Sequence, residues 1–118
     1  MTNFSELRVF LCMTPTSMNF SFDRLMGLAE RIFNQDPLSG HLFLFVNRYR
    51  NRIRILYWDR DGYVLTMKRL EQGRYRIPWR SEQGHVIIEA AELLLVLEGI
   101  DVTNAARRKR WSPRHAAA

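Results

Sequence analysis

The sequence has few of the residues that cross-link small proteins or anchor them in membranes. Its 118 residues include one cysteine, Cys12, so neither an intramolecular disulfide nor a cysteine zinc cluster can form. No apolar run approaches the roughly 18 residues of a membrane-spanning helix, and the N-terminus lacks a charged region followed by an apolar run. These absences predict a cytoplasmic protein in a reducing compartment, with Cys12 as a buried small hydrophobic residue.

Lysine is also scarce, because 16 of the 18 basic residues are arginine. Arginine favours planar, bidentate contact with phosphate, bases or carboxylates, although a GC-rich genome gives the same bias. The segment from Arg48 to Arg80 holds ten basic and three acidic residues, a net charge of +7 against +6 for the whole chain. Such an imbalance predicts a surface that faces phosphates or another polyanion.

Hydrophobic periodicity predicts two helices. The first follows Asn19 or Ser21, either of which can cap it, and ends before Pro37. The second ends at Gly99. The residues expected to face the sheet from the second helix are Ala91, Leu94, Leu95 and Leu97.

Runs of β-branched and aromatic residues predict the strands, and the four between residues 41 and 77 predict an antiparallel meander in which Gly62 takes a positive φ at a tight turn. The fold class expected is α+β: a mostly antiparallel sheet, two helices packed on one face, and an arginine face left for a partner. Residues 1–103 are expected to form one domain and residues 104–118 a basic, mobile tail. The expected strands span residues 6–13, 41–46, 52–58, 63–70, 74–77 and 85–88.

The alternating arginines of this sheet are the candidate nucleic-acid contacts. Basic side chains contact phosphates, and the neighbouring aromatic residues Tyr49, Trp58 and Trp79 can stack on exposed bases or form a protein interface. The alternative is a solvated outer face of an arginine-rich protein. The candidate contacts in the domain are Arg48, Arg50, Arg52, Arg54, Lys68, Arg69, Arg74 and Arg76, and those in the tail are Arg107, Arg108, Lys109 and Arg110.

No set of residues predicts an active site, a metal site or a cofactor. A metal-dependent nuclease needs converging carboxylates, for which Asp36, Asp59 and Asp61 are the candidates. Aspartates that flank a tight hairpin more commonly accept hydrogen bonds of the turn itself. The histidines show no ligand spacing with each other or with Cys12. We therefore expect a non-enzymatic protein.

Three segments carry a resemblance to a known family: SFDRLMGLAERIFNQDPLSGHLFLF at residues 21–45, NRYRNRIRILYWDRDGYVLTMKRLEQGRYRIP at residues 47–78, and LLLVLEGID at residues 93–101. Over about residues 7–101 the chain resembles the TnpB-type accessory proteins of the insertion-sequence-sixty-six group of bacterial transposable elements. The resemblance implies a non-catalytic protein that acts beside a separate transposase. Its implied partners are DNA at the element ends, the transposase and a second accessory protein.

Two functions follow as hypotheses. The first is a DNA-binding accessory protein of transposition that helps to assemble the transposase complex. The second is a protein-interaction adaptor that docks the transposase or the second accessory protein without contacting DNA, with arginines as interface anchors. The oligomeric state stays open, since an exposed edge strand can pair two chains.

Overall fold

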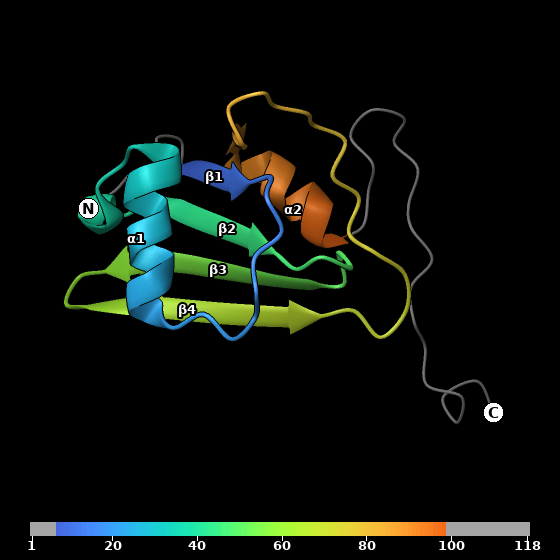
Figure 1. Ribbon diagram of the computed structural model, residues 1–118, viewed down its shortest axis with the longest axis horizontal. Coiled ribbons are helices and arrows are strands. Elements are labelled where there is room, and N and C mark those ends of the chain that lie inside the picture. The colour runs from blue at the N-terminus through green and yellow to red at the C-terminus, as the bar shows by residue number, and fades with distance from the viewer. Residues whose placement is uncertain (1–6, 99–118) are drawn as a thin grey trace.

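The computed structural model describes residues 7–98 (Figure 1). It contains a five-stranded sheet, two α-helices and a short 3-10 turn, which confirms the predicted α+β class. Within this range, no helix has the length and apolar character needed to cross a membrane. The elements in chain order are β1 (Arg8–Cys12), α1 (Phe22–Phe33), η2 (Pro37–Ser39), β2 (Leu42–Val46), β3 (Arg52–Asp59), β4 (Gly62–Arg69), β5 (His85–Glu89) and α2 (Ala90–Glu98).

The sheet has the strand order β4-β3-β2-β1-β5. β1 and β2 are parallel and are connected through α1, whereas every other neighbouring pair is antiparallel. The predicted meander is therefore three strands long, β2 to β4, and residues 74–77 form no strand. That segment instead leaves the sheet to bury Tyr75, and the Tyr75 amide donates a hydrogen bond of 2.7 Å to the carbonyl oxygen of Arg50.

The two helices lie on opposite faces of the sheet, so the prediction that both pack on one face is wrong. Successive strand residues point to opposite faces. Phe10 and Phe43 accordingly pack in the core beneath α1, whereas Val9 and Leu44 pack in the core beneath α2. Because the inner strands are apolar on both faces, each face needs its own cover. Figure 1 shows the sheet between the two helices.

The core beneath α1 is built around aromatic rings. The Phe33 ring on α1 lies 5.5 Å from that of Phe43 and 5.7 Å from that of Phe10, measured between ring centroids. Such pairs add roughly 0.5–1.5 kcal/mol beyond the free energy of burial. Cys12 lies in the same core, and its thiol donates to the carbonyl oxygen of Thr14. Burial raises the pKa of the Cys12 thiol, as expected for a buried small hydrophobic residue.

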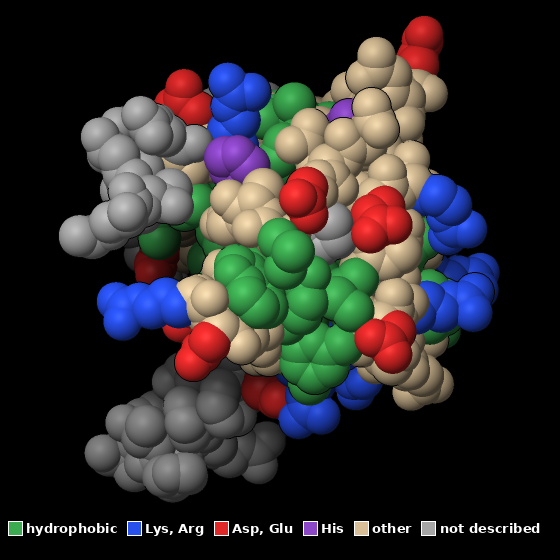
Figure 2. Space-filling view, turned by 90° about the vertical axis from the view of Figure 1, so that its left-hand side faces the viewer, with side chains coloured by type: hydrophobic (Ala, Val, Ile, Leu, Met, Phe, Trp, Pro, Cys, Tyr) green, Lys and Arg blue, Asp and Glu red, His purple; other side chains and the backbone are tan. Residues whose placement is uncertain are grey.

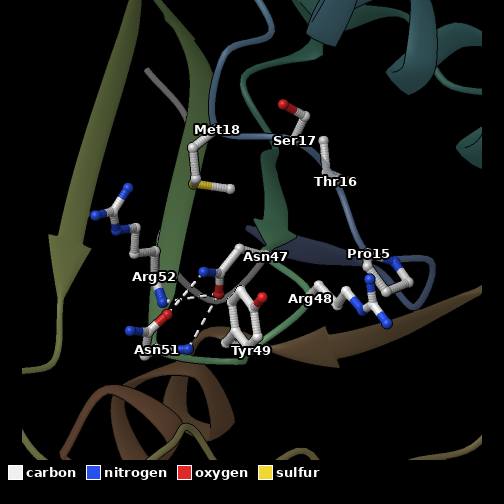
Figure 3. Close-up of a pocket in the computed structure, with 9 residues that line it drawn as sticks. All are labelled: Pro15, Thr16, Ser17, Met18, Asn47, Arg48, Tyr49, Asn51 and Arg52. Atoms are coloured by element: carbon white, nitrogen blue, oxygen red, sulfur yellow. Dashed lines mark hydrogen bonds between the residues drawn. The ribbon is translucent and has the colours of Figure 1, made fainter.

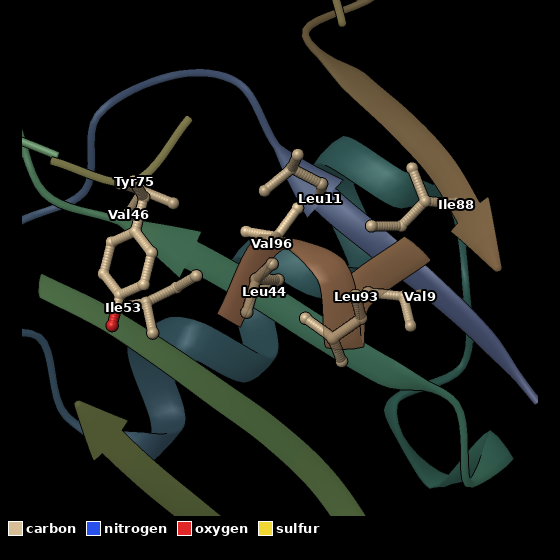
Figure 4. Close-up of a cluster of buried hydrophobic side chains, with 9 residues drawn as sticks. All are labelled: Val9, Leu11, Leu44, Val46, Ile53, Tyr75, Ile88, Leu93 and Val96. Carbon is tan, nitrogen blue, oxygen red and sulfur yellow. The ribbon is translucent and has the colours of Figure 1, made fainter. Parts of the chain in front are cut away.

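The core beneath α2 is aliphatic apart from Tyr75 (Figure 4). α2 turns Leu93 and Val96 toward the sheet, while Ala91 and Leu94 are exposed, so the predicted orientation of this helix is wrong. Most residues of α2 are apolar, so the sequence alone is compatible with more than one rotation of the helix about its axis. α2 begins directly after β5 with no intervening loop, and this junction fixes its rotation. The predicted stop at Gly99 lies outside the described residues.

The turns correct one further prediction. α1 ends before Pro37, as expected, and its C-cap residue Asn34 takes the left-handed conformation. Ser21 occupies the N-cap position without a side-chain cap bond. In the β3–β4 turn, however, the left-handed residue is Arg60, with φ of 57°, and not Gly62.

Candidate nucleic-acid interface

The turn between β2 and β3 is held by one asparagine side chain. The Asn47 Oδ1 atom accepts hydrogen bonds of 3.0 Å from the amides of Asn51 and Arg52, and the Asn47 Nδ2 atom donates to Asn51 Oδ1 at 2.7 Å. Arg50 completes the reversal in the left-handed conformation. The backbone is thus fixed from within the turn, and the side chain of Tyr49 stays 65% exposed.

A groove of about 510 Å³ lies between this turn and the loop that follows β1. The loop is attached to the sheet where the Thr16 amide donates to the carbonyl oxygen of Val46 at 2.9 Å. Figure 3 shows Arg48 and Arg52 on either side of Tyr49. None of the lining residues is acidic; they are Pro15, Thr16, Ser17, Met18, Asn47, Arg48, Tyr49, Asn51 and Arg52.

Further cations lie at the same end of the sheet. Arg69 is the cross-strand partner of Arg52, and like charges in that arrangement repel each other. Glu71 relieves part of this repulsion, because it forms a 2.7 Å ion pair with Arg69. The segment after β4 returns to the same turn through the bond from Tyr75 to Arg50. We call this region the basic end; its cations are Arg48, Arg50, Arg52, Lys68, Arg69, Arg74 and Arg76.

Arg54 does not belong to the basic end, although its sequence pattern places it with Arg52. Its side chain is 8% exposed and lies on the sheet face that α1 covers. Its Nη1 atom donates to the carbonyl oxygens of Phe20 at 2.8 Å and Met18 at 3.1 Å. Burial lowers the pKa of the Arg54 guanidinium, which nevertheless stays charged because its ordinary pKa is so high. Arg54 therefore holds the loop before α1 and is not free to contact a phosphate.

The three predicted stacking residues lie in three different environments. Tyr49 is exposed and lines the groove. Trp79 is half-buried against the core beneath α2. Trp58 lies near the far end of β3 and packs edge-on against Tyr63, with the ring centroids 5.1 Å apart. Of the three, Tyr49 is the one that lines the groove.

The opposite end of the β3–β4 hairpin is apolar and acidic. Figure 2 looks onto this end and shows hydrophobic side chains with acidic side chains around them. Leu38 is half exposed there. Burial, and then the nearby carboxylates of Asp36 and Glu30, raise the pKa of Tyr63. We call this region the aromatic end; it comprises Leu38, Trp58 and Tyr63 with Asp36, Asp59 and Asp61.

The carboxylates proposed for a nuclease do not form a metal site. Asp36 accepts a hydrogen bond from the Leu38 amide at 2.9 Å and thereby caps the 3-10 turn η2. Asp59 and Asp61 are exposed at the β3–β4 turn. Within residues 7–98 no three His, Cys, Asp or Glu side chains are grouped to hold a metal ion. The tail candidates Arg107, Arg108, Lys109 and Arg110 lie outside the described residues.

Sequence reasoning missed the wall of the groove formed by residues 15–18. Nothing in the order of residues indicates that the loop after β1 returns to the β2–β3 turn, since Thr16 and Val46 are thirty residues apart. The one available signal is the Asn47–Asn51 pair, because asparagines that flank a short turn commonly bond to its backbone.

The fold and the site define a small basic α+β protein with cations gathered at one end of the sheet, two of which, Arg48 and Arg52, line a groove. The family model described as IS66 Orf2-like protein matches residues 7–107, so the chain belongs to this family. Its members are accessory proteins of IS66 insertion sequences and not a known catalytic family. This confirms the family resemblance of the three sequence segments.

Two curated proteins of Sinorhizobium fredii (strain NBRC 101917 / NGR234) are similar along nearly their whole length. The uncharacterised protein y4hO is 31% identical over 108 residues, which cover 92% of this chain and 91% of the relative. The uncharacterised protein y4jC is 28% identical over 111 residues, which cover 94% of both. No solved structure matches the chain.

Proposed function

We propose that this protein is a non-catalytic accessory factor of transposition that binds DNA through its basic end and helps to assemble the transposase complex. The observation that carries the proposal is the gathering of seven cations with one acidic residue, Glu71, at one end of the sheet, where Arg48 and Arg52 line a groove beside the exposed Tyr49. Such a role places the protein in the bacterial cytoplasm.

The groove suits a sugar–phosphate backbone better than a base edge. Arg48 and Arg52 lie at its sides as flexible cationic donors, and planar guanidinium groups bind phosphate oxygens in pairs. The exposed ring of Tyr49 offers a face on which an unpaired base can stack. Contacts of this kind position a protein on nucleic acid and depend strongly on salt.

Fluorescence anisotropy tests the proposal directly. The purified protein is titrated into a labelled duplex of the terminal inverted repeat of its own element, with a scrambled duplex of equal length as control, across about 50–200 mM salt. Preferential binding to the terminal repeat at the upper salt limit supports end recognition. Equal, salt-sensitive binding to both duplexes supports DNA association with specificity supplied by the transposase. Absence of binding at about 50 mM salt overturns the proposal.

A second candidate function, a protein-interaction adaptor without DNA contact, is favoured by the aromatic end. A groove there is lined by Tyr57, Trp58 and Leu38, among others, and aromatic residues are enriched in protein interfaces. The adaptor hypothesis predicts a stoichiometric complex with the transposase or the second accessory protein in nuclease-treated samples. Loss of that complex in Trp58→Ala, with retention in Tyr49→Ala, supports docking through the aromatic end. A complex that forms only when DNA is added argues against this candidate.

A further inference from the structure

The outer edge of β4 is the longer of the two strand edges of the sheet within residues 7–98. β4 pairs with β3 alone, and the ladder closes at the pair of Asp59 and Gly62. In a two-residue hairpin this closing pair is hydrogen-bonded, and the pattern then alternates. The backbone N–H and C=O groups of Tyr63, Leu65 and Met67 consequently point away from β3. Within residues 7–98 no other segment bonds to them.

This edge lacks the usual protection against pairing with another strand. Native proteins guard edges with proline, central charges, bulges or short strands. The pairing of β4 with β3 is continuous over eight residues, without a bulge, and the run from Val64 to Met67 contains neither proline nor charge. The opposite edge strand, β5, is short, with five residues against eight in β4. β4 is therefore the edge available to a partner.

Apolar side chains beside this edge are also uncovered. Phe22 belongs to the same helical stripe as Leu25 and Ala29, which are fully buried, yet Phe22 is 43% exposed. α1 begins over the β4 side of the sheet (Figure 1). Met67 of β4, on the sheet face that α1 covers, is 61% exposed. The chain leaves apolar surface above its own edge strand, as an interface at that edge requires.

We propose that β4 pairs antiparallel with β4 of a second copy, so that a two-fold axis joins two sheets into one of ten strands. The charges favour this direction. β4 begins beside Asp59 and Asp61 and ends with Lys68 and Arg69. Antiparallel pairing places the acidic turn of each copy beside the basic strand end of the other, whereas parallel pairing places like charges together.

The alternation of the strand restricts the register. Residues that face each other across the new ladder must lie on the same face of the joined sheet, so odd-numbered residues pair with odd-numbered ones. The register that retains the longest apolar overlap pairs Leu65 with Leu65 of the second copy. It also pairs Tyr63 with Met67 of the second copy. This register is hydrogen-bonded at each of these pairs, because all three residues direct their backbone groups outward.

Sedimentation equilibrium of the full chain, without DNA, tests the dimer. A particle of twice 14.0 kDa is expected at micromolar concentration. Met67→Pro removes an outward N–H while sparing the β3–β4 ladder, so a folded monomer is expected. Met67→Thr retains the N–H and is the matched control, expected to remain dimeric. A monomeric wild type, or a dimeric Met67→Pro variant, overturns the proposal.

Disulfide trapping tests the same interface without a proline. In a Cys12→Ala background, a single cysteine at Leu65 faces its own copy across the axis at a Cα separation of about 5.5 Å, within the range for a disulfide. In this register, position 64 lies opposite position 66 of the second copy. A single cysteine at Val64 or at Thr66 therefore does not face the same cysteine of the second copy, and these two variants are the controls. Mild oxidation is expected to cross-link Leu65→Cys at least ten-fold faster than either control. Equal rates at the three positions, or a faster rate at a control, overturn the proposed pairing.

Discussion

The two ends of the β3–β4 hairpin carry opposite charge, although the same two strands connect them. Arg52 and Arg69 face each other at one end, and the turn with Asp59 and Asp61 closes the other. Strands of eight residues separate the two ends by about 25 Å. At the moderate salt of a cell this exceeds the Debye length of about 8 Å, so each end presents its own field to a partner.

The net charge of a segment therefore does not describe a surface. The net charge of +7 of residues 48–80 suggests one basic sheet face. The middle residues of the strands, however, are covered by α1 on one face and by the segment after β4 on the other. The cations of the basic end come from a turn, the ends of two strands and an irregular segment. The aromatic end keeps the acidic residues of the same segment, apart from Glu71.

The largest effect on stability is expected for substitution of Arg54, the buried arginine that holds the loop before α1. Arg54→Ala removes two hydrogen bonds from a charged donor and leaves the carbonyl oxygens of Met18 and Phe20 without this partner. The free energy of unfolding should fall by about 2–4 kcal/mol. Urea denaturation followed by circular dichroism measures the loss.

The matched control is Arg52→Ala, two residues away on the same face of the same strand. Its side chain is half-buried and lines the groove. The free energy of unfolding should change by no more than about 0.5 kcal/mol. Equal losses of stability in the two variants would contradict the assignment of a structural role to Arg54 alone.

The next effect concerns DNA and tests whether the basic end alone binds it. Arg48→Ala combined with Arg52→Ala removes two cations from the sides of the groove. If each contacts a phosphate, the log–log salt slope of binding becomes shallower by about 1.8, since each contact contributes about 0.9. Anisotropy titrations give both slopes. The control is Asp59→Asn combined with Asp61→Asn, which removes two charges of the opposite sign from the aromatic end. An equal loss of slope in that control would show that the groove has no special role.

A helix or strand was predictable from sequence where its hydrophobic pattern is compatible with only one orientation of the element. The stripe from Phe22 to Phe33 admits a single rotation of α1, and Pro37 sets its end. The run from His41 to Val46, apolar on both faces, correctly predicts an inner strand. The same observation implies that both faces need cover, which already favours helices on opposite faces.

The site was less predictable, because alternation does not say which face a helix covers. Arg52 and Arg54 share a face and a spacing, and only the path of residues 14–21 makes one of them structural. Likewise, the stretch around Tyr75 has the composition of a strand, but burial of that ring beneath α2 outweighs strand pairing. Contacts between distant segments decide such cases, and local patterns do not contain them.

A smaller effect is expected at the turn of the aromatic end. Arg60 takes the left-handed conformation, which strains a residue with a Cβ atom. Arg60→Gly should raise the free energy of unfolding by about 0.5–1 kcal/mol. Gly62→Ala should be close to neutral, because no atom lies within 4 Å of the added Cβ. Thermal denaturation distinguishes the two variants, and the reverse ranking would restore Gly62 as the strained position.

The smallest effect expected is a pH dependence confined to the aromatic end. His41 lines the groove there, and its Nδ1 atom accepts a 3.0 Å hydrogen bond from the Arg8 amide. Burial, and then the charge of Arg8, lower the pKa of His41 below its ordinary 6.5. The unfolded chain therefore binds this proton more readily than the folded chain does. The contribution of His41 to stability is present above about pH 6.5 and is lost as the pH falls.

Urea denaturation at about pH 7.5 and pH 5.5 measures this contribution. The wild type should lose more stability on acidification than His41→Gln, which cannot titrate. The basic end has no histidine, and its guanidinium and ammonium groups stay charged at both values. Binding through the basic end should consequently respond to salt and hardly to pH in this range. If His41→Gln and the wild type lose equal stability, His41 is not the group responsible, and the two ends no longer differ in their response to pH.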